Sequence, residues 1–174
     1  MSLKDLIKDS HDRAEQTAFM RSIFAGTLSL DKWADFVYQK SLFYSTIETQ
    51  AKSVGLFDDL PGIERAELLA QDYNEMATTV CTPKETTKDY MTYLRGLTTA
   101  DDIMAHVYTW HMGYLSGAQM IKRVVSAPHR ALDFDNADLL KTNIRVKLKD
   151  TMSTEANCAF EWAIKLLEEY DESK

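Results

Sequence analysis

The stretch Tyr108-Thr109-Trp110-His111-Met112-Gly113-Tyr114-Leu115-Ser116-Gly117-Ala118-Gln119-Met120-Ile121 is patterned as a helix, yet it carries two glycines in its interior. A glycine inside a helix costs about 1 kcal/mol relative to alanine. Gly113 and Gly117 are four residues apart, a spacing that places them on one helical face. Because that face lacks side chains, a flat molecule can lie directly against the backbone. The stretch therefore predicts a surface for a planar cofactor, and close packing of another helix is the alternative.

The composition predicts one globular domain over residues 1–174. The formal net charge of −7 argues against a nucleic acid as the main partner. No apolar run approaches the roughly 18 residues of a membrane span, and we expect no signal peptide because the N-terminus lacks an apolar core. Cys81 and Cys158 form no CxxC motif, which is typical of a reducing, cytoplasmic setting.

Apolar residues recur at helical spacing along the whole chain, without strand-like alternation and without a repeat. Ser2, Ser29 and Thr99 are capping residues in front of three of these patterns. Thr82-Pro83-Lys84-Glu85 combines a cap, a proline at the first helical position and an acid at the third. We expect an all-α bundle. Its predicted helices cover residues 2–20, 29–55, a segment after Pro61-Gly62, 82–96, 100–125, 136–150 and 154–169, with a loop over 126–135.

His11 lies on the apolar stripe of the first predicted helix, four residues after Ile7 and three before Ala14. An imidazole at this place can coordinate iron through one ring nitrogen, while Glu15, one turn further on, accepts a hydrogen bond from the other. The alternative is a hydrogen-bonded core histidine, the commoner fate of a lone histidine on such a stripe. Together with the bare glycine face, His11 predicts a site for a flat iron cofactor such as heme.

Basic side chains form two groups suited to binding a pair of carboxylates. They are Lys4 with Lys8, which precede His11 at helical spacing, and Lys141 with Arg145, which share a face of the next-to-last predicted helix. Lysine and arginine bind carboxylates through charge-assisted hydrogen bonds, so these groups match the propionates of a heme. The alternative is a solvated basic face, the usual role of such a cluster.

Two motifs resemble those of the heme oxygenase family, and the resemblance covers nearly the whole chain. The run Lys4…Lys8…His11-Asp12-Arg13-Ala14-Glu15-Gln16-Thr17-Ala18-Phe19-Met20 resembles the proximal-helix motif of that family. Tyr108-Thr109 and Gly113-x-Leu115-Ser116-Gly117-x-Gln119 resemble its distal-helix motif, in the expected order. The resemblance implies a multi-helix bundle in which heme b is sandwiched between the first helix and a kinked central helix.

The resemblance also implies roles for single residues. His11 would be the proximal iron ligand, and the backbone of Gly113 and Gly117 would pass close over the distal face of the heme. Tyr44 matches a distal-pocket tyrosine. Lys8, Lys141 and Arg145 match propionate-binding positions, Phe160 matches a wall of the pocket, and the motifs add Lys4, Glu15, Met20, Tyr108 and Ser116 to the heme-contacting residues.

The implied activity is oxidative cleavage of heme to biliverdin, ferrous iron and carbon monoxide, with O2 and external electrons, and with attack expected at the α-meso carbon. Heme is then both cofactor and substrate, and a histidine ligand leaves the opposite side of the iron open. Because the chain has no flavin or nicotinamide fingerprint, reduced ferredoxin is the expected donor, docking on Lys4, Lys8 and Lys141. A downstream bilin reductase is a further expected partner, and a monomer is the expected state.

The chain departs from the family pattern in the distal motif. Tyr114 stands where most members carry an aspartate, Trp110 replaces an arginine, Ala118 replaces a glycine, and Ala163 aligns with an asparagine. We expect the Tyr114 hydroxyl, or a water held with Tyr44, to replace the carboxylate that orders distal water. The alternative is a Tyr114 that points outward and packs.

Other functions stay open at this point. The altered distal residues are compatible with a peroxidase-like protein, or with a heme carrier or sensor that does not cleave the ring. A thiaminase-type hydrolase of the same architecture would use Cys81 or Cys158 as its nucleophile. A di-iron carboxylate bundle is disfavoured because Glu-x-x-His occurs nowhere in the chain. We assign no catalytic role to His106, His111 or His129.

Overall fold

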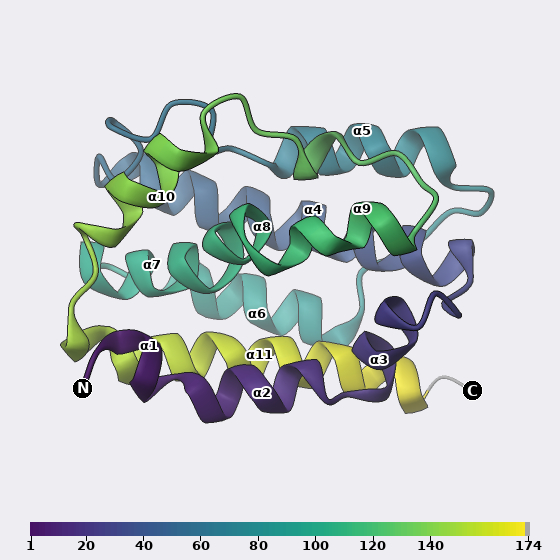
Figure 1. Ribbon diagram of the computed structural model, residues 1–174, viewed down its shortest axis with the longest axis horizontal. Coiled ribbons are helices and arrows are strands. Elements are labelled where there is room, and N and C mark those ends of the chain that lie inside the picture. The colour runs from purple at the N-terminus through teal and green to yellow at the C-terminus, as the bar shows by residue number, and fades with distance from the viewer. Residues whose placement is uncertain (173–174) are drawn as a thin grey trace.

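The computed structural model describes residues 1–172, which contain helices and no strand (Figure 1), so the predicted all-α fold is confirmed. The α-helices are α1 (Leu3–Leu6), α2 (Lys8–Glu15), α3 (Ala18–Phe24), α4 (Leu30–Ser53), α5 (Ala66–Met76), α6 (Glu85–Arg95), α7 (Ala100–Val107), α8 (Gly113–Leu115), α9 (Ile121–Val124), α10 (Ala137–Arg145) and α11 (Ser153–Glu172). Shorter turns are the π-helical η1 (Tyr108–Met112) and the 3-10 turns η2 (Gly117–Met120), η3 (Arg130–Leu132) and η4 (Asp150–Met152).

The N-terminal region is not the single helix predicted over residues 2–20. Ser2 and Asp5 form a capping box that starts α1, as expected. The helix is interrupted at Ile7, whose backbone angles of φ −104° and ψ 0° leave the helical region. A second interruption follows α2, where the Thr17 side chain accepts the Met20 N–H and caps α3. The Thr17 hydrogen bond competes with the helical ladder and separates α3 from α2, whereas the break at Ile7 has no side-chain cap.

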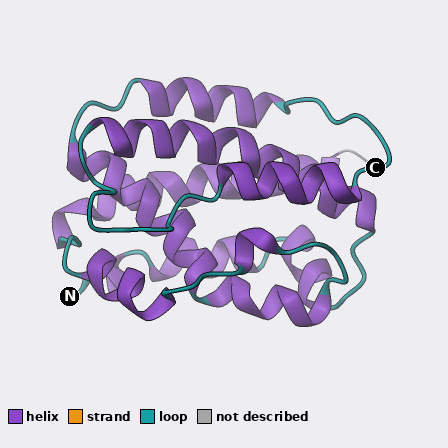
Figure 2. Ribbon diagram, turned by 90° about the horizontal axis from the view of Figure 1, so that it is seen from above, coloured by secondary structure: helices purple, strands orange, loops and turns teal. Residues whose placement is uncertain are grey.

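Helix α4 runs through the core and has the ends that the sequence predicts. Ser29 caps it by accepting the Lys32 N–H, and Gly55 follows its end with a positive φ of 73°. α4 packs against α5, α6 and α7, and Figure 2 shows that several of the longer helices run alongside one another. The hydrophobic core extends from Leu3 in α1 to Tyr170 in α11. This burial is the main stabilising contribution to a helical bundle.

Two other helices have different ends from those predicted. α6 starts at Glu85 with Lys84 as its cap, and not at Thr82. The reason is Gln39 of α4, which donates to the Thr82 carbonyl and accepts the Lys84 N–H, so that this stretch stays extended. α10 ends at Arg145 and not near residue 150. Past its end the Leu148 N–H bonds the Arg145 carbonyl, a tighter turn than the α-helix allows.

The central segment, predicted as one helix over residues 100–125, is divided into five successive helical elements. α7 starts at the predicted cap Thr99, continues as η1 and then as α8. The helix breaks at Ser116, with φ −121° and ψ −100°, before η2 and α9 complete the segment. The Gln119 side-chain amide donates to the carbonyls of Tyr114 and Leu132, at 2.7 and 2.8 Å. A kink is therefore present, and Gln119 satisfies a carbonyl that the kink releases from the helix.

The N-terminal helices and the central segment meet through α11. Helix α11 contacts α2, α3, α7 and η1, while α3 also contacts α9. In Figure 1 α2 and α11 lie side by side at the bottom of the view, and α7 and α8 lie above them. The fold thus places the proximal motif on α2 and the start of the distal motif on η1 against the same helix, α11. Within the described residues, none of the helices is both long enough and apolar enough to cross a bilayer.

Candidate functional site

The backbone of Gly113 and Gly117 faces open space. A Cβ atom built on either residue would meet no other atom within 4 Å, apart from its own chain neighbours and local helix backbone. Gly113 opens α8 and is half-buried, whereas Gly117 follows the kink and is exposed. Neither glycine has a positive φ, so neither is required by backbone conformation. Helix packing therefore leaves the space beside each glycine open, but the break at Ser116 interrupts the regular helical spacing from which the sequence predicts that both lie on one face.

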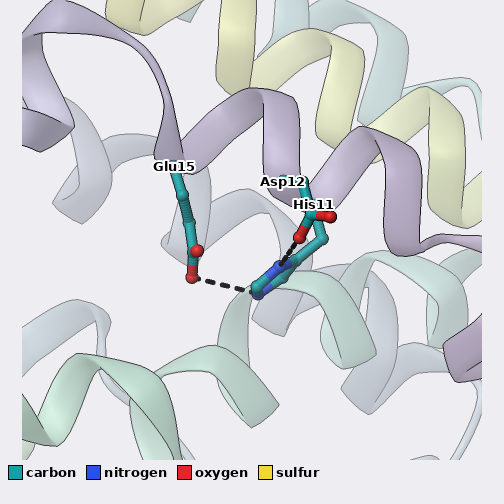
Figure 3. Close-up of side chains that lie close together, drawn as sticks. All are labelled: His11, Asp12 and Glu15. Carbon is teal, nitrogen blue, oxygen red and sulfur yellow. Dashed lines mark ion pairs between the residues drawn. The ribbon is translucent and has the colours of Figure 1, made fainter.

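His11 lies on α2 with nearly half of its side chain, 47%, exposed. Its Nε2 atom is 3.5 Å from Oε1 of Glu15, and its Nδ1 atom is 3.6 Å from Oδ1 of Asp12 (Figure 3). The ring meets the edge of Phe160 of α11, with ring centroids 5.7 Å apart. An exposed imidazole flanked by two carboxylates and one aromatic ring can still bind a ligand.

The expectation that His11 shares a packed apolar stripe with Ile7 is wrong. Ile7 is buried, Ala14 is half-buried and His11 is exposed. The backbone of Lys8–Glu15 is helical and the His11 N–H bonds the Ile7 carbonyl, so the exposure of His11 reflects how α2 packs on its neighbours and not a change in spacing. The alternative interpretation of His11 as a core histidine is excluded by the same exposure.

The distal tyrosines lie in the core. Tyr44 of α4 has no exposed surface, and its hydroxyl donates to the Trp110 carbonyl at 2.9 Å. The Tyr114 ring lies 5.4 Å from the Tyr44 ring and is only 6% exposed, so an outward-pointing Tyr114 is excluded. Burial raises the pKa of both phenols above the ordinary value. Both phenols therefore stay protonated near neutral pH.

A buried lysine, Lys40, lies beside these tyrosines, and we call Tyr44, Tyr114, Lys40 and the residues packed around them the distal wall. The Nζ atom of Lys40 lies 4.3 to 4.7 Å from the ring centroids of Trp33, Phe36 and Tyr114, and the residue is 1% exposed. Burial lowers the pKa of Lys40 to about 7, with a smaller opposing contribution from Asp72. The sequence reasoning missed Lys40, although its position four residues before Tyr44 on the apolar stripe of α4 was a signal.

The chain is similar to known proteins along most of its length. A family model described as heme oxygenase matches residues 1–139. The chain belongs to the heme oxygenase family. Heme oxygenase 2 of Oryctolagus cuniculus is 26% identical over 98% of this chain and 65% of its own length. The heme oxygenase of Porphyra purpurea is 24% identical over 98% of this chain and 86% of its own length. The chain thus spans less than two thirds of the length of heme oxygenase 2.

Solved structures share the fold. Heme oxygenase from Leptospira interrogans superposes with a TM-score of 0.84 at 20% identity, covering 97% of this chain and 100% of that chain. Heme oxygenase-1 from Synechocystis sp. PCC 6803, in complex with heme, gives a TM-score of 0.79 at 22% identity, covering 96% and 89%. The arrangement of helices in this chain is therefore that of heme oxygenases.

The residues present fit a heme. A flat macrocycle needs a wall without Cβ atoms, which Gly113 and Gly117 provide. It also needs an accessible nitrogen ligand, which His11 provides, and apolar edges such as Phe160. Of the other predicted contact residues, Met20 and Tyr108 are half-buried and pack against the core, and Ser116 is exposed at the kink.

The predicted basic residues lie on three helices, with Lys141 and Arg145 both on α10. Lys4 and Lys8 are exposed on α1 and α2, and Nζ of Lys8 is paired with Oδ2 of Asp12 at 2.5 Å. Arg145 is exposed on α10, while Lys141 lines a hollow of about 270 Å³ beside the central segment, together with Leu115, Gln119 and Lys122. Lys141 is therefore placed next to the distal motif, whereas a carboxylate ligand of Lys8 would compete with Asp12.

Two buried histidines escaped the sequence analysis. His111 of η1 bonds Oε2 of Glu48 through Nε2 at 2.8 Å, and its Nδ1 is buried with no partner among the described residues. Glu48 also accepts the backbone N–H groups of Arg65 and Ala66 at the start of α5. This carboxylate ties η1 to α5 across α4. The signal available was Glu48 itself, an acid four residues after Tyr44 on a buried stripe.

The two cysteines do not suit a hydrolase. Burial raises the pKa of both Cys81 and Cys158 above the ordinary thiol value. An activated cysteine nucleophile needs a lowered pKa, so neither thiol is prepared for attack. This finding and the family membership remove the support for the thiaminase-type alternative.

Proposed function

We propose that the protein is a heme oxygenase enzyme that cleaves heme to biliverdin, ferrous iron and carbon monoxide, with O2 and electrons from an external donor. The observation that carries the proposal is the pairing of an accessible imidazole, His11 on α2, with the open backbone of Gly113 and Gly117 in the segment that follows η1, since α2 and η1 both contact α11. Membership of the heme oxygenase family supports it. Bound heme supplies a redox-active iron at which O2 is activated, and it is also the substrate.

On the α2 side, His11 would hold the iron through one ring nitrogen. Glu15 and Asp12 flank the two nitrogens at 3.5 and 3.6 Å, so a carboxylate is placed to accept the N–H of the nitrogen that does not bind iron. Such a hydrogen bond fixes the ring and strengthens the ligand. The exposed imidazole becomes buried when a macrocycle covers it, which excludes water from this face.

On the distal side, the backbone of Gly113 and Gly117 would approach the macrocycle closely and select the edge that is attacked, with the α-meso position as our expectation. Tyr44 holds the segment in place through the Trp110 carbonyl. Tyr114, with the Tyr44 hydroxyl beside it, would take the place of the usual aspartate in ordering distal water. Propionates would be bound by Lys8, Lys141 and Arg145, with Lys4 nearby on α1.

The external donor we propose is reduced ferredoxin, docking on the basic rim of Lys4, Lys8 and Lys141. Electrostatic docking of this kind weakens as salt shortens the Debye length from about 30 Å at 0.01 M to about 8 Å at 0.15 M. Ferredoxin-driven turnover should therefore fall several-fold over this range, and turnover independent of salt would contradict docking at this rim. We further propose a monomer in the cytoplasm, consistent with the two free thiols, and a bilin reductase as the consumer of the product.

A heme titration followed by a single turnover tests the function. Growth of a Soret band and its replacement by a bilin band on adding O2 and reduced ferredoxin is the expected result. His11→Ala should lose the imidazole signature in the electron paramagnetic resonance spectrum of the heme complex. His129→Ala is the matched control, because His129 is equally exposed but lies in the loop before η3. A chain that binds no heme would contradict the proposal.

One observation favours a second candidate, a heme binder that does not cleave the ring. The Tyr44 hydroxyl is committed to the Trp110 carbonyl, and the Trp110 indole N–H is committed to Tyr90. If these groups keep their partners, the distal side holds fewer free donors for activating oxygen. The single turnover separates the two candidates, because a binder keeps its Soret band and forms no bilin.

A further inference from the structure

A continuous chain of hydrogen bonds starts one turn before Gly113 and runs away from it. The Trp110 indole N–H donates to the Tyr90 oxygen at 3.0 Å. The Tyr90 hydroxyl lies 2.6 Å from Nδ1 of His106, and Nε2 of His106 lies 2.8 Å from Oε1 of Glu155. Tyr90 is 2% exposed and His106 is not exposed at all. The heme site described above uses only Trp110 of these residues.

The direction of each hydrogen bond follows from Glu155. Its hydrogen bond from His106, followed by the weaker contribution of Tyr93, lowers the pKa of Glu155, so the carboxylate is an acceptor. The singly protonated tautomer that donates to this carboxylate carries its proton on Nε2 and has a bare Nδ1. Tyr90 then donates its O–H to Nδ1. The phenol thus has a base in place to receive its proton.

The chain continues through groups that are easily oxidised. The Tyr90 ring stacks on Trp162 of α11, with centroids 5.3 Å apart and ring planes at 22°. Trp162 contacts the Tyr93 ring at 5.6 Å, and the Tyr93 hydroxyl donates to Glu155 at 2.5 Å. The Cys158 thiol donates to the Tyr93 oxygen at 3.4 Å. Trp162, Tyr93 and Cys158 are all half-buried.

We propose that these residues form a proton-coupled oxidation path that carries an oxidising equivalent from Trp110 through Tyr90 and Tyr93 to the half-buried Cys158 thiol. The path has a protective function that goes beyond heme cleavage, since it removes oxidising equivalents from the distal wall. Tyrosine oxidation is favourable only when the phenolic proton has an acceptor, and the structure gives Tyr90 the bare Nδ1 of His106. Tyr93 has the Glu155 carboxylate in the same role.

The first half of the path removes one electron and one proton from Tyr90. A one-electron oxidant, of the class that peroxide generates at a heme iron, removes one electron from Trp110. The Trp110 radical cation takes one electron from Tyr90, whose O–H bond breaks as its proton moves to Nδ1 of His106. The products are neutral Trp110, a Tyr90 phenoxyl radical and a His106 imidazolium beside the Glu155 carboxylate.

The second half of the path restores Tyr90. Its phenoxyl radical takes one electron from Tyr93 across Trp162 and recovers its proton from His106, while the Tyr93 proton moves to Glu155. The Tyr93 phenoxyl radical then takes a hydrogen atom from the Cys158 thiol and leaves a thiyl radical. A small external thiol or ascorbate donates the hydrogen atom that restores Cys158, and Glu155 releases its proton to water.

Pulse radiolysis of the heme-free protein with azide radicals tests the path, because azide radicals oxidise tryptophan selectively. The indolyl band should decay as the phenoxyl band grows, at a rate independent of protein concentration and slowed in deuterium oxide. Tyr90→Phe should lower this intramolecular rate by about tenfold or more, equivalent to a barrier increase of about 1.4 kcal/mol. His106→Gln should also slow it, because the proton acceptor is lost.

Tyr38→Phe is the matched control, since Tyr38 of α4 packs only on Tyr73 among the aromatic rings described and lies outside the path. Its transfer rate should equal that of the wild type. Trp110→Phe is a second variant for the case that Tyr90→Phe does not fold. It should reduce the yield of the phenoxyl radical. An unchanged rate in Tyr90→Phe, or transfer that depends on protein concentration, would overturn the path. Failure of heme binding would overturn the proposed function and leave this result unaffected.

Discussion

The α2 wall and the distal wall of the candidate heme site are built differently. On α2, His11, Glu15 and Lys8 are exposed, and their contacts are with residues on the same helix or with the ring of Phe160. In the distal wall, Tyr44 and the residues around it are buried and are joined across α4, the central segment and α5. Function on α2 therefore depends on a few side chains, whereas the distal wall is also part of what holds the fold together.

The largest expected effect concerns Glu48 in the distal wall. Glu48→Ala leaves the N–H groups of Arg65 and Ala66 and the ring of His111 without their acceptor. Because these groups are buried, we expect the free energy of unfolding to fall by about 3–5 kcal/mol, measured by urea denaturation. Glu64→Ala is the control, since Glu64 is exposed, and it should change stability little. A small loss in Glu48→Ala would contradict the role of this carboxylate.

Lys40 sharpens the comparison because it is a charge buried in the same wall. The pKa of Lys40 is lowered from 10.5 to about 7 by burial. Between these two values the unfolded chain binds more protons than the fold, so the stability contributed by this group rises as pH increases from about 7 and is lowest below about 7. Lys40→Met should therefore be more stable than the wild type at pH 7, by about 1–4 kcal/mol.

The difference between Lys40→Met and the wild type should shrink as the pH rises toward 10, as measured by urea denaturation at several pH values. Lys32→Met, an exposed lysine on the same helix, is the control and should show no such trend. A Lys40→Met variant that is less stable at pH 7 would show that contacts with the three aromatic rings outweigh the cost of burying the ammonium.

The smallest effect on stability is expected on α2. His11→Ala removes an exposed side chain whose nearest polar groups are themselves exposed. The free energy of unfolding should change by less than about 0.5 kcal/mol, as measured by urea denaturation, while iron coordination is lost. A loss of several kcal/mol would mean that α2 is as structural as the distal wall, and the contrast between the two walls would be broken.

Features that depend on local sequence were predicted correctly, whereas features that depend on contacts between helices were not. Ser29 and Thr99 were identified as caps, and Gly113 and Gly117 as a bare surface, because capping and missing side chains act locally. The break before α3 was not predicted, because the Thr17 cap depends on how its side chain is oriented, which the sequence does not show. The start of α6 was misplaced because Gln39, on another helix, holds residues 82–84 extended.

The distal wall was the least predictable part of the site. Nothing local in the sequence brings Lys40 beside Tyr114, or Glu155 beside His106, because these pairs come from different helices. A charged residue on an apolar helical stripe is the one local sign of such burial, and Lys40 and Glu48 both carry it. His106 and His111 were left without a role for the same reason.

The central claim is that His11 and the open glycine backbone are two walls of one heme site, and heme titration of Gly113→Leu and Gly117→Leu tests it most directly. A Cβ atom at either position meets only open space, and leucine favours the helix over glycine, so the free energy of unfolding should be unchanged or slightly higher. Heme affinity should fall by about tenfold or more, a loss of about 1.4 kcal/mol, and Gly96→Ala, at the end of α6, should leave it unchanged. Undiminished heme affinity in both leucine variants would contradict the claim.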